Sequence, residues 1–164
     1  MLLRASPWAC LCVIAVFCAP GSGVSAAGES RKTAAGQAAD GARAAVDRVL
    51  EDYVGLYAPS TLDRWKALFH PSLTVASPNQ DGTILVRDLD HFVGAQRSYL
   101  ATDPAIAERL ENVRVEMGRR IARVSADFIL VEKGTEHTGK LGLHLVEGQD
   151  GWRIVAIVFA YDAA

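Results

Sequence analysis

The segment LFHPSLTVASP, residues 68–78, brings a histidine and a serine close together in the sequence. A serine nucleophile needs a histidine within hydrogen-bond reach, and that histidine needs a carboxylate to orient it. His70 precedes Pro71, which is expected to end a helix, so we expect His70 at a solvent-facing corner. Ser77 ends a short predicted strand. No Ser–His–acid spacing surrounds either residue, and a catalytic triad is therefore not predicted.

The remaining histidines and the cysteines indicate no metal site. His91 falls in the first turn of a predicted helix and His137 in a predicted hairpin loop, and both are expected at the surface. The sequence has neither an HxH nor an HExxH spacing, and its 3 cysteines all lie in an N-terminal segment that is expected to be removed. We therefore predict no metal and no cofactor.

Aromatic residues form a second set that could bind a ligand. Tyr53 and Tyr57 are four residues apart and share one face of a predicted helix. Aromatic walls with a few polar tips suit flat, mostly apolar ligands, although each residue could equally pack in the core. The predicted ligand-binding residues are Tyr53, Tyr57, Trp65, Phe69, Ser77, Phe92, Gln96, His144 and Phe159.

Acid–base chemistry would need a titratable group beside the tyrosines. Asp127 lies on a long predicted strand, where it is either outward and solvated or buried close to Tyr53 as a proton donor or base. His144 alternates with Leu143 and Leu145 and points to the sheet face that these leucines do not occupy. The catalytic candidates are therefore Tyr53, Asp127 and His144.

The first 26 residues have the layout of a secretory signal peptide. Arg4 is followed by the apolar run ACLCVIAVFCA, residues 9–19, and then by the small residues Val24 and Ala26. This run is shorter than the ~20 residues of a membrane-spanning helix, although a retained anchor and lipidation of Cys18 are alternatives. We expect export to the periplasm or the medium, with membrane contact only during export.

The rest of the chain divides into a linker and one domain. Residues 27–40 are small, polar and aperiodic and predict a flexible linker, while residues 41–164 supply enough apolar sequence for one domain. The formal net charge is -2 and the sequence has no basic patch. Nucleic acid is therefore not an expected partner.

The hydrophobic pattern changes from a helical period to alternation along this domain. Pro59 ends a first helix that begins at residue 42, Ser60 and Pro71 bound a second helix, and Asp88 caps a third. Six later or intervening segments alternate as strands do, namely residues 73–77, 83–87, 109–117, 121–131, 140–147 and 152–161. This order predicts an α+β domain in which three helices cover one face of a strongly curved antiparallel sheet.

The order of elements and three motifs resemble the NTF2-like superfamily. The motifs are YVGLYAPSTLDRWKALFHPSLTV (53–75), QDGTILVRDLDHFV (80–93) and LGLHLVEGQDGWRIVAIVF (141–159). They are most similar to the lumazine-binding branch, followed by the ketosteroid isomerase and polyketide cyclase (SnoaL-like) branches. The resemblance implies a cystatin-like cone with a pocket in its mouth. It implies no single function, because the superfamily includes enzymes, transport factors and domains without known chemistry.

The isomerase branch makes a chemical comparison possible. In that branch a tyrosine of the first helix stabilises an oxyanion, and an aspartate of the first strand moves the proton. Matched to this sequence, the tyrosine is Tyr53 and the aspartate position is Ser77. An unassisted serine hydroxyl does not titrate near neutral pH, so the isomerase mechanism does not carry over intact.

Three functions remain open. The first is an exported domain that binds a small, mostly apolar or aromatic molecule without an evident catalytic set. The second is an isomerase, cyclase or dehydratase that uses Tyr53 with Asp127 or His144, which requires these residues to share one cavity. The third is a homodimerisation or protein-interaction module, which an apolar outer row on the last strands would favour.

Overall fold

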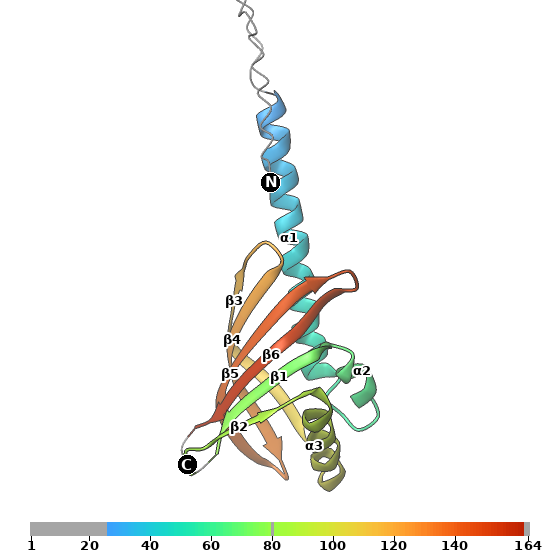
Figure 1. Cartoon of the computed structure of the whole chain (residues 1–164), viewed down its shortest axis with the longest axis vertical. Coiled ribbons are helices and arrows are strands. Elements are labelled where there is room, and N and C mark those ends of the chain that lie inside the picture. Colours follow the sequence, from blue (N-terminus) through green and yellow to red (C-terminus); the bar gives the residue numbers. More distant parts are fainter. Residues whose placement is uncertain (1–25, 80, 163–164) are drawn as a thin grey trace, which may run out of the picture.

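The structure is a computed structural model that describes residues 26–79 and 81–162. Almost all of the predicted signal peptide lies outside these residues. None of the helices within the described ranges is both long and apolar enough to cross a bilayer. The elements are α1 (Ala26–Gly55), α2 (Leu62–Lys66), β1 (Phe69–Pro78), β2 (Ile84–Arg87), α3 (Leu89–Thr102), β3 (Ala107–Met117), β4 (Ile121–Glu132), β5 (Thr135–Gly148) and β6 (Gly151–Tyr161) (Figure 1).

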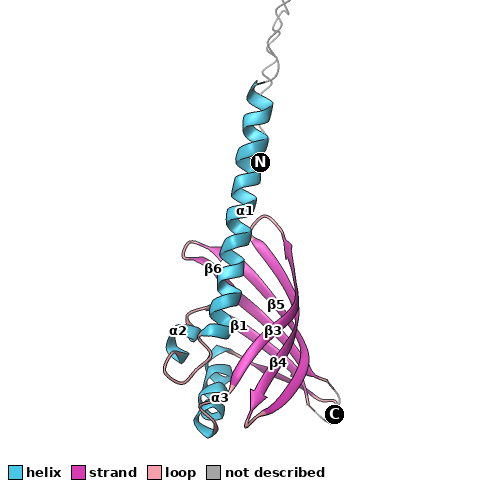
Figure 2. Cartoon of the chain, turned by 180° about the vertical axis from the view of Figure 1, so that it is seen from behind, coloured by secondary structure: helices cyan, strands magenta, loops and turns pink. Residues whose placement is uncertain are grey.

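The six strands form one curved sheet with the order β2-β1-β6-β5-β4-β3. The three helices lie on its concave side (Figure 2). Neighbouring strands are antiparallel except for β1 and β6, which are parallel. The predicted α+β class, with helices on one face of a curved sheet, is confirmed. The sheet is therefore mixed and not wholly antiparallel as predicted: β6 follows β5 in a hairpin and lies beside β1 in the same direction.

Register shifts interrupt three of the strand pairs, β1–β6, β3–β4 and β5–β6. In β3 the shift falls between Glu111 and Arg114, and Asn112 between them has a left-handed backbone with a φ of 50°. In β1 the irregular part contains Pro71, which cannot donate to a ladder of hydrogen bonds. Because such bulges bend a strand and increase its twist, they favour the curvature that encloses the helices.

Alternate residues of each strand build the core. On β5, Leu141, Leu143 and Leu145 are at most 5% exposed, whereas His144 between them is exposed. Trp65 of α2 is only 1% exposed and packs in the same core. Each such side chain contributes about 1.5–3 kcal/mol by its removal from water. The core therefore holds the helices against the concave face.

Helix α1 begins earlier than the sequence predicts. It runs through residues 27–40, for which a flexible linker is predicted, and the side chains of residues 36–41 are exposed. This segment is rich in alanine, which has the highest helix propensity, so it needs no apolar stripe to be helical. The apolar period is absent because this part of α1 projects beyond the sheet and has no surface to pack on (Figure 1).

The second helix is shorter than predicted. It ends at Lys66 and not at Pro71, because β1 already begins at Phe69. The predicted cap of the third helix is confirmed. The Asp88 side chain accepts a hydrogen bond from the backbone N–H of His91 at 2.9 Å.

The connection between β4 and β5 is also shorter than predicted. It consists of Lys133 and Gly134, and both residues have a positive φ, 49° and 78°. A two-residue loop with this backbone is a type I′ turn, whose twist matches that of the flanking strands. His137 therefore lies within β5, where it pairs with Leu130, and not in a loop.

Candidate functional site

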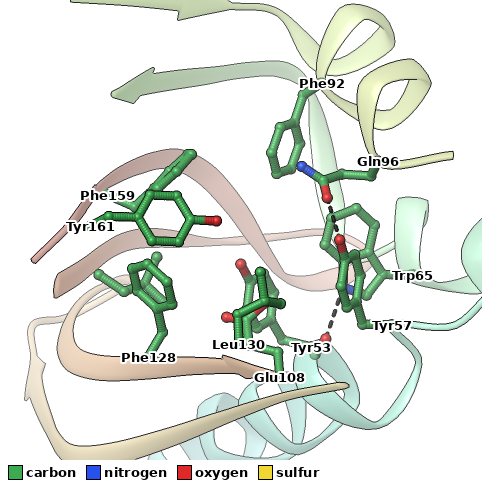
Figure 3. A pocket seen from close by; sticks show the side chains of 11 residues that line it. Tyr53, Tyr57, Trp65, Phe92, Gln96, Glu108, Phe128, Leu130, Phe159 and Tyr161 are labelled. Carbon is green, nitrogen blue, oxygen red and sulfur yellow. Dashed lines mark hydrogen bonds between the residues drawn. The ribbon is translucent and has the colours of Figure 1, made fainter. Parts of the chain in front are cut away.

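A small hollow, which we call the chamber, lies between the concave face of the sheet and the helices (Figure 3). Its volume is about 50 Å³. All three helices and the strands β3, β4, β5 and β6 contribute to its wall. The lining residues are Tyr53, Tyr57, Trp65, Phe92, Gln96, Glu108, Phe128, Leu130, Leu141, Phe159 and Tyr161.

Aromatic rings form the helix side of the chamber. The ring of Trp65 lies at the centre of this cluster, with its centroid 4.6–5.7 Å from those of Tyr53, Tyr57, Phe69 and Phe92. Phe69 packs behind the others and does not line the chamber. The cluster joins α1, α2, α3 and β1, so a single aromatic core positions the helix side of the wall.

Two hydrogen bonds fix the helix side further. The Trp65 Nε1–H donates to the backbone carbonyl of Tyr53 at 2.8 Å, and the Tyr57 hydroxyl donates to Gln96 Oε1. Burial raises the pKa of Tyr53 and that of Tyr57, with a smaller contribution from the charge of Glu108. Both hydroxyls are therefore neutral at physiological pH and can serve as hydrogen-bond donors.

Three more rings form the strand side of the chamber. Phe128, Phe159 and Tyr161 pack edge to face, with centroids 5.1–6.3 Å apart. Gly139 on β5 makes room for Phe128, since a Cβ at this glycine would come within 2.4 Å of the ring. The glycine in the strand is therefore part of how the wall is built.

Among the described residues that line the chamber, Glu108 on β3 is the one with a carboxyl group (Figure 3). Its pKa is raised to about 7, and the cause is desolvation by burial. No hydrogen bond or basic residue within the described part of the chain offsets this cost. The Glu108 side chain is half-buried, and a partly buried carboxyl that lacks a partner and has a raised pKa is a feature typical of binding and catalytic sites.

The alternation of side chains along β3 explains why Glu108 lies on the inner face of the sheet. Glu108 pairs with Leu130 and Leu110 pairs with Phe128, and cross-strand partners share one face of a sheet. Sequence reasoning missed Glu108 because the predicted strand begins at Arg109 and leaves the residue in a loop. The available signal was its alternation with Leu110, which placed a carboxyl in phase with an inward apolar residue.

A larger open depression, which we call the vestibule, adjoins the chamber. Its volume is about 650 Å³, and Leu130 and Tyr161 line both hollows. Tyr161 is 54% exposed and therefore stands at the boundary between the chamber and solvent. None of the described residues that line the vestibule is a lysine or an arginine. Its acidic lining residues are Glu132, Glu136 and Asp162.

The structure brings six of the nine predicted ligand-binding residues together around the chamber. Ser77 is 8% exposed and lies on the inner face of β1 beside β2, but it does not line the chamber. Phe69 is buried in the adjoining core and His144 lies on the opposite face of the sheet. The six that line the chamber are Tyr53, Tyr57, Trp65, Phe92, Gln96 and Phe159.

Two of the catalytic candidates, Asp127 and His144, are wrong as partners of Tyr53. Asp127 lies on the outer face, where its carboxylate is 2.7 Å from Lys140 Nζ and accepts a hydrogen bond from Asn112 Nδ2 at 2.8 Å. These bonds lower its pKa. Both residues alternate with inward apolar neighbours, and a strand cannot turn adjacent side chains to one face. The sheet therefore separates both from the chamber.

The other histidines lie at the surface and outside the chamber. His70 Nδ1 is 2.6 Å from Ser72 Oγ, and His91 Nδ1 is 2.8 Å from an Asp88 carboxylate oxygen. His137 is exposed and lines the vestibule. Within residues 26–79 and 81–162, no group of three or more histidine, cysteine or acidic side chains has a geometry that could hold a metal ion.

The fold and the pocket in its concave face define a domain of the NTF2-like class. A family model described as "Putative lumazine-binding" matches residues 41–160, and the chain belongs to this family. No curated protein sequence matches the chain.

Solved structures of low sequence identity share the fold. An NTF2-like protein with a cystatin-like fold from Novosphingobium aromaticivorans has a TM-score of 0.66 at 15% identity, over 80% of this chain and 90% of that one. A protein from Kribbella flavida has a TM-score of 0.64 at 15% identity, over 76% and 93%. A "putative dehydratase from the NTF2-like family" of Streptomyces avermitilis has a TM-score of 0.62 at 12% identity, over 76% and 99%.

Proposed function

We propose that the domain binds a small molecule whose end group enters the chamber and whose body lies in the vestibule. The observation that carries this proposal is the unpaired Glu108 carboxyl within an aromatic wall that continues, at Tyr161, into the vestibule. Small-molecule sites combine apolar walls with a few polar groups in this way. The lumazine-binding description of the family supports a small-molecule ligand.

The volumes of the two hollows determine how much of the ligand each accepts. A cavity of about 150 Å³ is known to hold one benzene ring, whereas the chamber has about 50 Å³. The body of a flat aromatic ligand therefore fits the vestibule, and a ring enters the chamber only if Tyr161 turns outward. Tyr161 is suited to this movement because it is half-exposed and ends β6.

A ligand screen with thermal unfolding as the readout tests this proposal. Ligands that bind the folded chain raise its midpoint of unfolding, and Tyr161→Ala is expected to raise the affinity for ring-bearing ligands several-fold by opening the chamber. His144→Ala changes an exposed residue on the outer face of the neighbouring strand β5 and serves as the matched control. The proposal fails if no ligand stabilises either the wild type or Tyr161→Ala.

A second function, acid–base catalysis, is favoured by Glu108 together with Tyr53. A carboxyl with a pKa of about 7 can take up a proton at neutral pH, and the neutral Tyr53 hydroxyl can donate to a developing oxyanion. Exchange of the α-protons of cyclic ketones in D₂O, followed by NMR, tests this function. The exchange rate is expected to rise as the pH passes 7 and to be lost in Glu108→Gln. Equal exchange in wild type and Glu108→Gln would exclude it.

We also propose that residues 1–26 direct export and are then removed. The basic start, short apolar run and small residues before Ala27 support this proposal. Mass spectrometry of the chain after expression in a bacterial host is expected to find a periplasmic product that begins near Ala27. An intact chain in the membrane fraction would favour a retained anchor instead.

Finally, we propose that the outer face of the sheet pairs two copies of the chain. Val86, Ala76 and Val158 form a row across β2, β1 and β6, and Ile84 lies beside this row. Ile84, Val86 and Val158 are 72%, 61% and 58% exposed. Exposed apolar side chains gathered in this way are typical of an interaction surface.

A further inference from the structure

The chamber accepts an end group of only a few heavy atoms. Each ordered water needs about 10–15 Å³ of such a cavity, so the 50 Å³ of the chamber corresponds to a few waters. A –CH₂–NH₃⁺ or –CH₂–OH end fits this space without any movement of the wall, whereas a ring does not. The chemistry of the wall decides which of these end groups is preferred.

The charged residues that line the two hollows are all acidic. Glu108 faces the chamber, and Glu132, Glu136 and Asp162 face the vestibule, with no lysine or arginine among the described lining residues. Lys133 Nζ lies 3.6 Å from Glu132, and Arg109 lies 3.0 Å from Glu136. These basic residues do not line the vestibule, but they partly neutralise the charges of the two carboxylates. Glu108 has no such partner among the residues that the structure describes. A passage lined by charges of one sign concentrates ligands of the opposite sign.

The rest of the chamber wall also suits a cation. Seven of its lining side chains are aromatic, and the electron-rich faces of aromatic rings attract ammonium groups. Phe128, Phe159 and Tyr161 are nearly perpendicular to each other, at 81–85°, so neighbouring rings present different sides to the hollow between them. Ring faces and a carboxylate together would stabilise an ammonium group placed here, and its methylene groups would pack against the ring edges.

We propose that the chamber binds the head of a primary or secondary alkylammonium, with Glu108 as its counter-ion and the remainder of the ligand in the acidic vestibule. This inference rests on the proposed binding function and specifies the class of its ligand. It excludes ligands whose inserted end is a carboxylate or a phosphate, because such an end would bring a second unpaired negative charge beside Glu108.

The ionisation of Glu108 gives this inference a pH dependence. The groups that face Glu108 are the hydroxyls of Tyr53 on α1, of Tyr57 just after the end of α1 and of Tyr161 on β6, and the pKa of each is raised. These hydroxyls stay neutral between pH 6 and 8, where Glu108, with a pKa of about 7, loses its proton. Alkylammonium affinity is therefore expected to rise about tenfold from pH 6 to pH 8, as the ionised fraction of Glu108 grows.

Three probes of nearly equal shape test the inference, namely pentylamine, 1-pentanol and pentanoate. Each is titrated into the full chain while NMR follows the indole N–H signal of Trp65 in the chamber wall, with Trp152 as an internal reference. Pentylamine is expected to bind at least tenfold more tightly than 1-pentanol at pH 8, and pentanoate is expected to leave the Trp65 signal unchanged. His137→Gln is measured beside the wild type, so that the histidine of the vestibule plays no part in the pH profile.

Two variants of β3 complete the experiment. Glu108→Gln is expected to bind pentylamine and 1-pentanol equally and to lose the pH dependence, whereas Glu116→Gln, which changes an exposed carboxylate of the same strand, is expected to match the wild type. The inference is overturned if 1-pentanol binds as tightly as pentylamine, or if Glu108→Gln keeps the preference for the amine. If none of the three probes shifts the Trp65 signal, the chamber is not a binding site and the proposed function fails with the inference.

Discussion

Two carboxylates on neighbouring strands of one sheet, Glu108 and Asp127, have opposite surroundings. Asp127 lies on the outer face between Lys140 and Asn112, and its pKa is lowered. Glu108 lies on the inner face in an aromatic wall, and its pKa is raised to about 7. The carboxylate of Asp127 already has hydrogen-bond and ion-pair partners. That of Glu108 has none among the described residues, and a ligand could supply one. The difference identifies the inner face as the functional one.

The same contrast between inner and outer face separates two adjacent residues of β5. Substitution of the inner one is expected to have the largest effect on the free energy of unfolding. Leu143 is 0% exposed and His144 beside it is exposed. Leu143→Ala is expected to lower the free energy of unfolding by about 3–4 kcal/mol, because it leaves a cavity in the core. His144→Ala is expected to change it by less than about 0.5 kcal/mol. Urea unfolding of both variants measures the difference, and similar losses would contradict the assignment of faces.

Glu108→Gln is expected to stabilise the chain at pH 8. The folded-state pKa of Glu108, about 7, lies above the ordinary value of 4.5, so folding takes up a proton between these values. The free energy of unfolding therefore falls as the pH rises from about 4.5 to 7, by roughly 3 kcal/mol in total. The variant carries no charge into the chamber and is expected to be more stable than the wild type by about this amount at pH 8. Equal stability at pH 5 and 8 in the wild type would contradict a half-buried Glu108 that is desolvated and unpaired.

The apolar part of the outer face is tested by its effect on association. Val158→Lys places a charge at the β6 end of the row formed with Val86 and Ala76. We expect the wild type to sediment as a dimer and the variant as a monomer, with little change in the midpoint of thermal unfolding of the monomer. The matched variant Arg123→Lys, on the charged half of the same face, is expected to remain dimeric. A monomeric wild type would exclude pairing through this row.

Asp127→Asn is expected to have the smallest effect. The Asp127–Lys140 pair is at the surface, where ion pairs contribute little and are screened by salt. Since the pKa of Asp127 is lowered on folding, the wild type is expected to lose this small stabilisation as the pH falls through the folded-state pKa, and the variant is not. A change as large as that of Glu108→Gln would contradict the contrast between the two faces.

Much of the fold could be predicted from local patterns. Apolar alternation identified the strands, and Asp88 was correctly expected to cap α3. The parallel pairing of β1 with β6 could not be predicted, because it depends on where the chain returns to the sheet and not on any local pattern. The helical start of α1 was missed because helix propensity without a packing surface leaves no apolar period.

The site could be predicted in its aromatic part but not in its acidic part. Tyr53 and Trp65 were identified because helical spacing places them on inward faces, and Tyr57 also faces inward although α1 already ends at Gly55. Asp127 was only a conditional candidate, and its position next to the apolar Phe128 on a strand already favoured the outer face. Glu108 was missed because β3 begins at Ala107, two residues earlier than the pattern predicts, so the residue was left in a loop and its alternation with Leu110 was not used.

The ionisation of Glu108 in the folded chain is the most direct test of this account. An NMR titration of its side-chain carboxyl carbon, assigned by comparison with Glu108→Gln, measures the pKa without any ligand. We predict a midpoint near 7, as expected for a carboxyl that is desolvated in the chamber and has no partner. A midpoint near 4.5, the ordinary value, would show that Glu108 is solvated or paired and would contradict the chamber as a functional site.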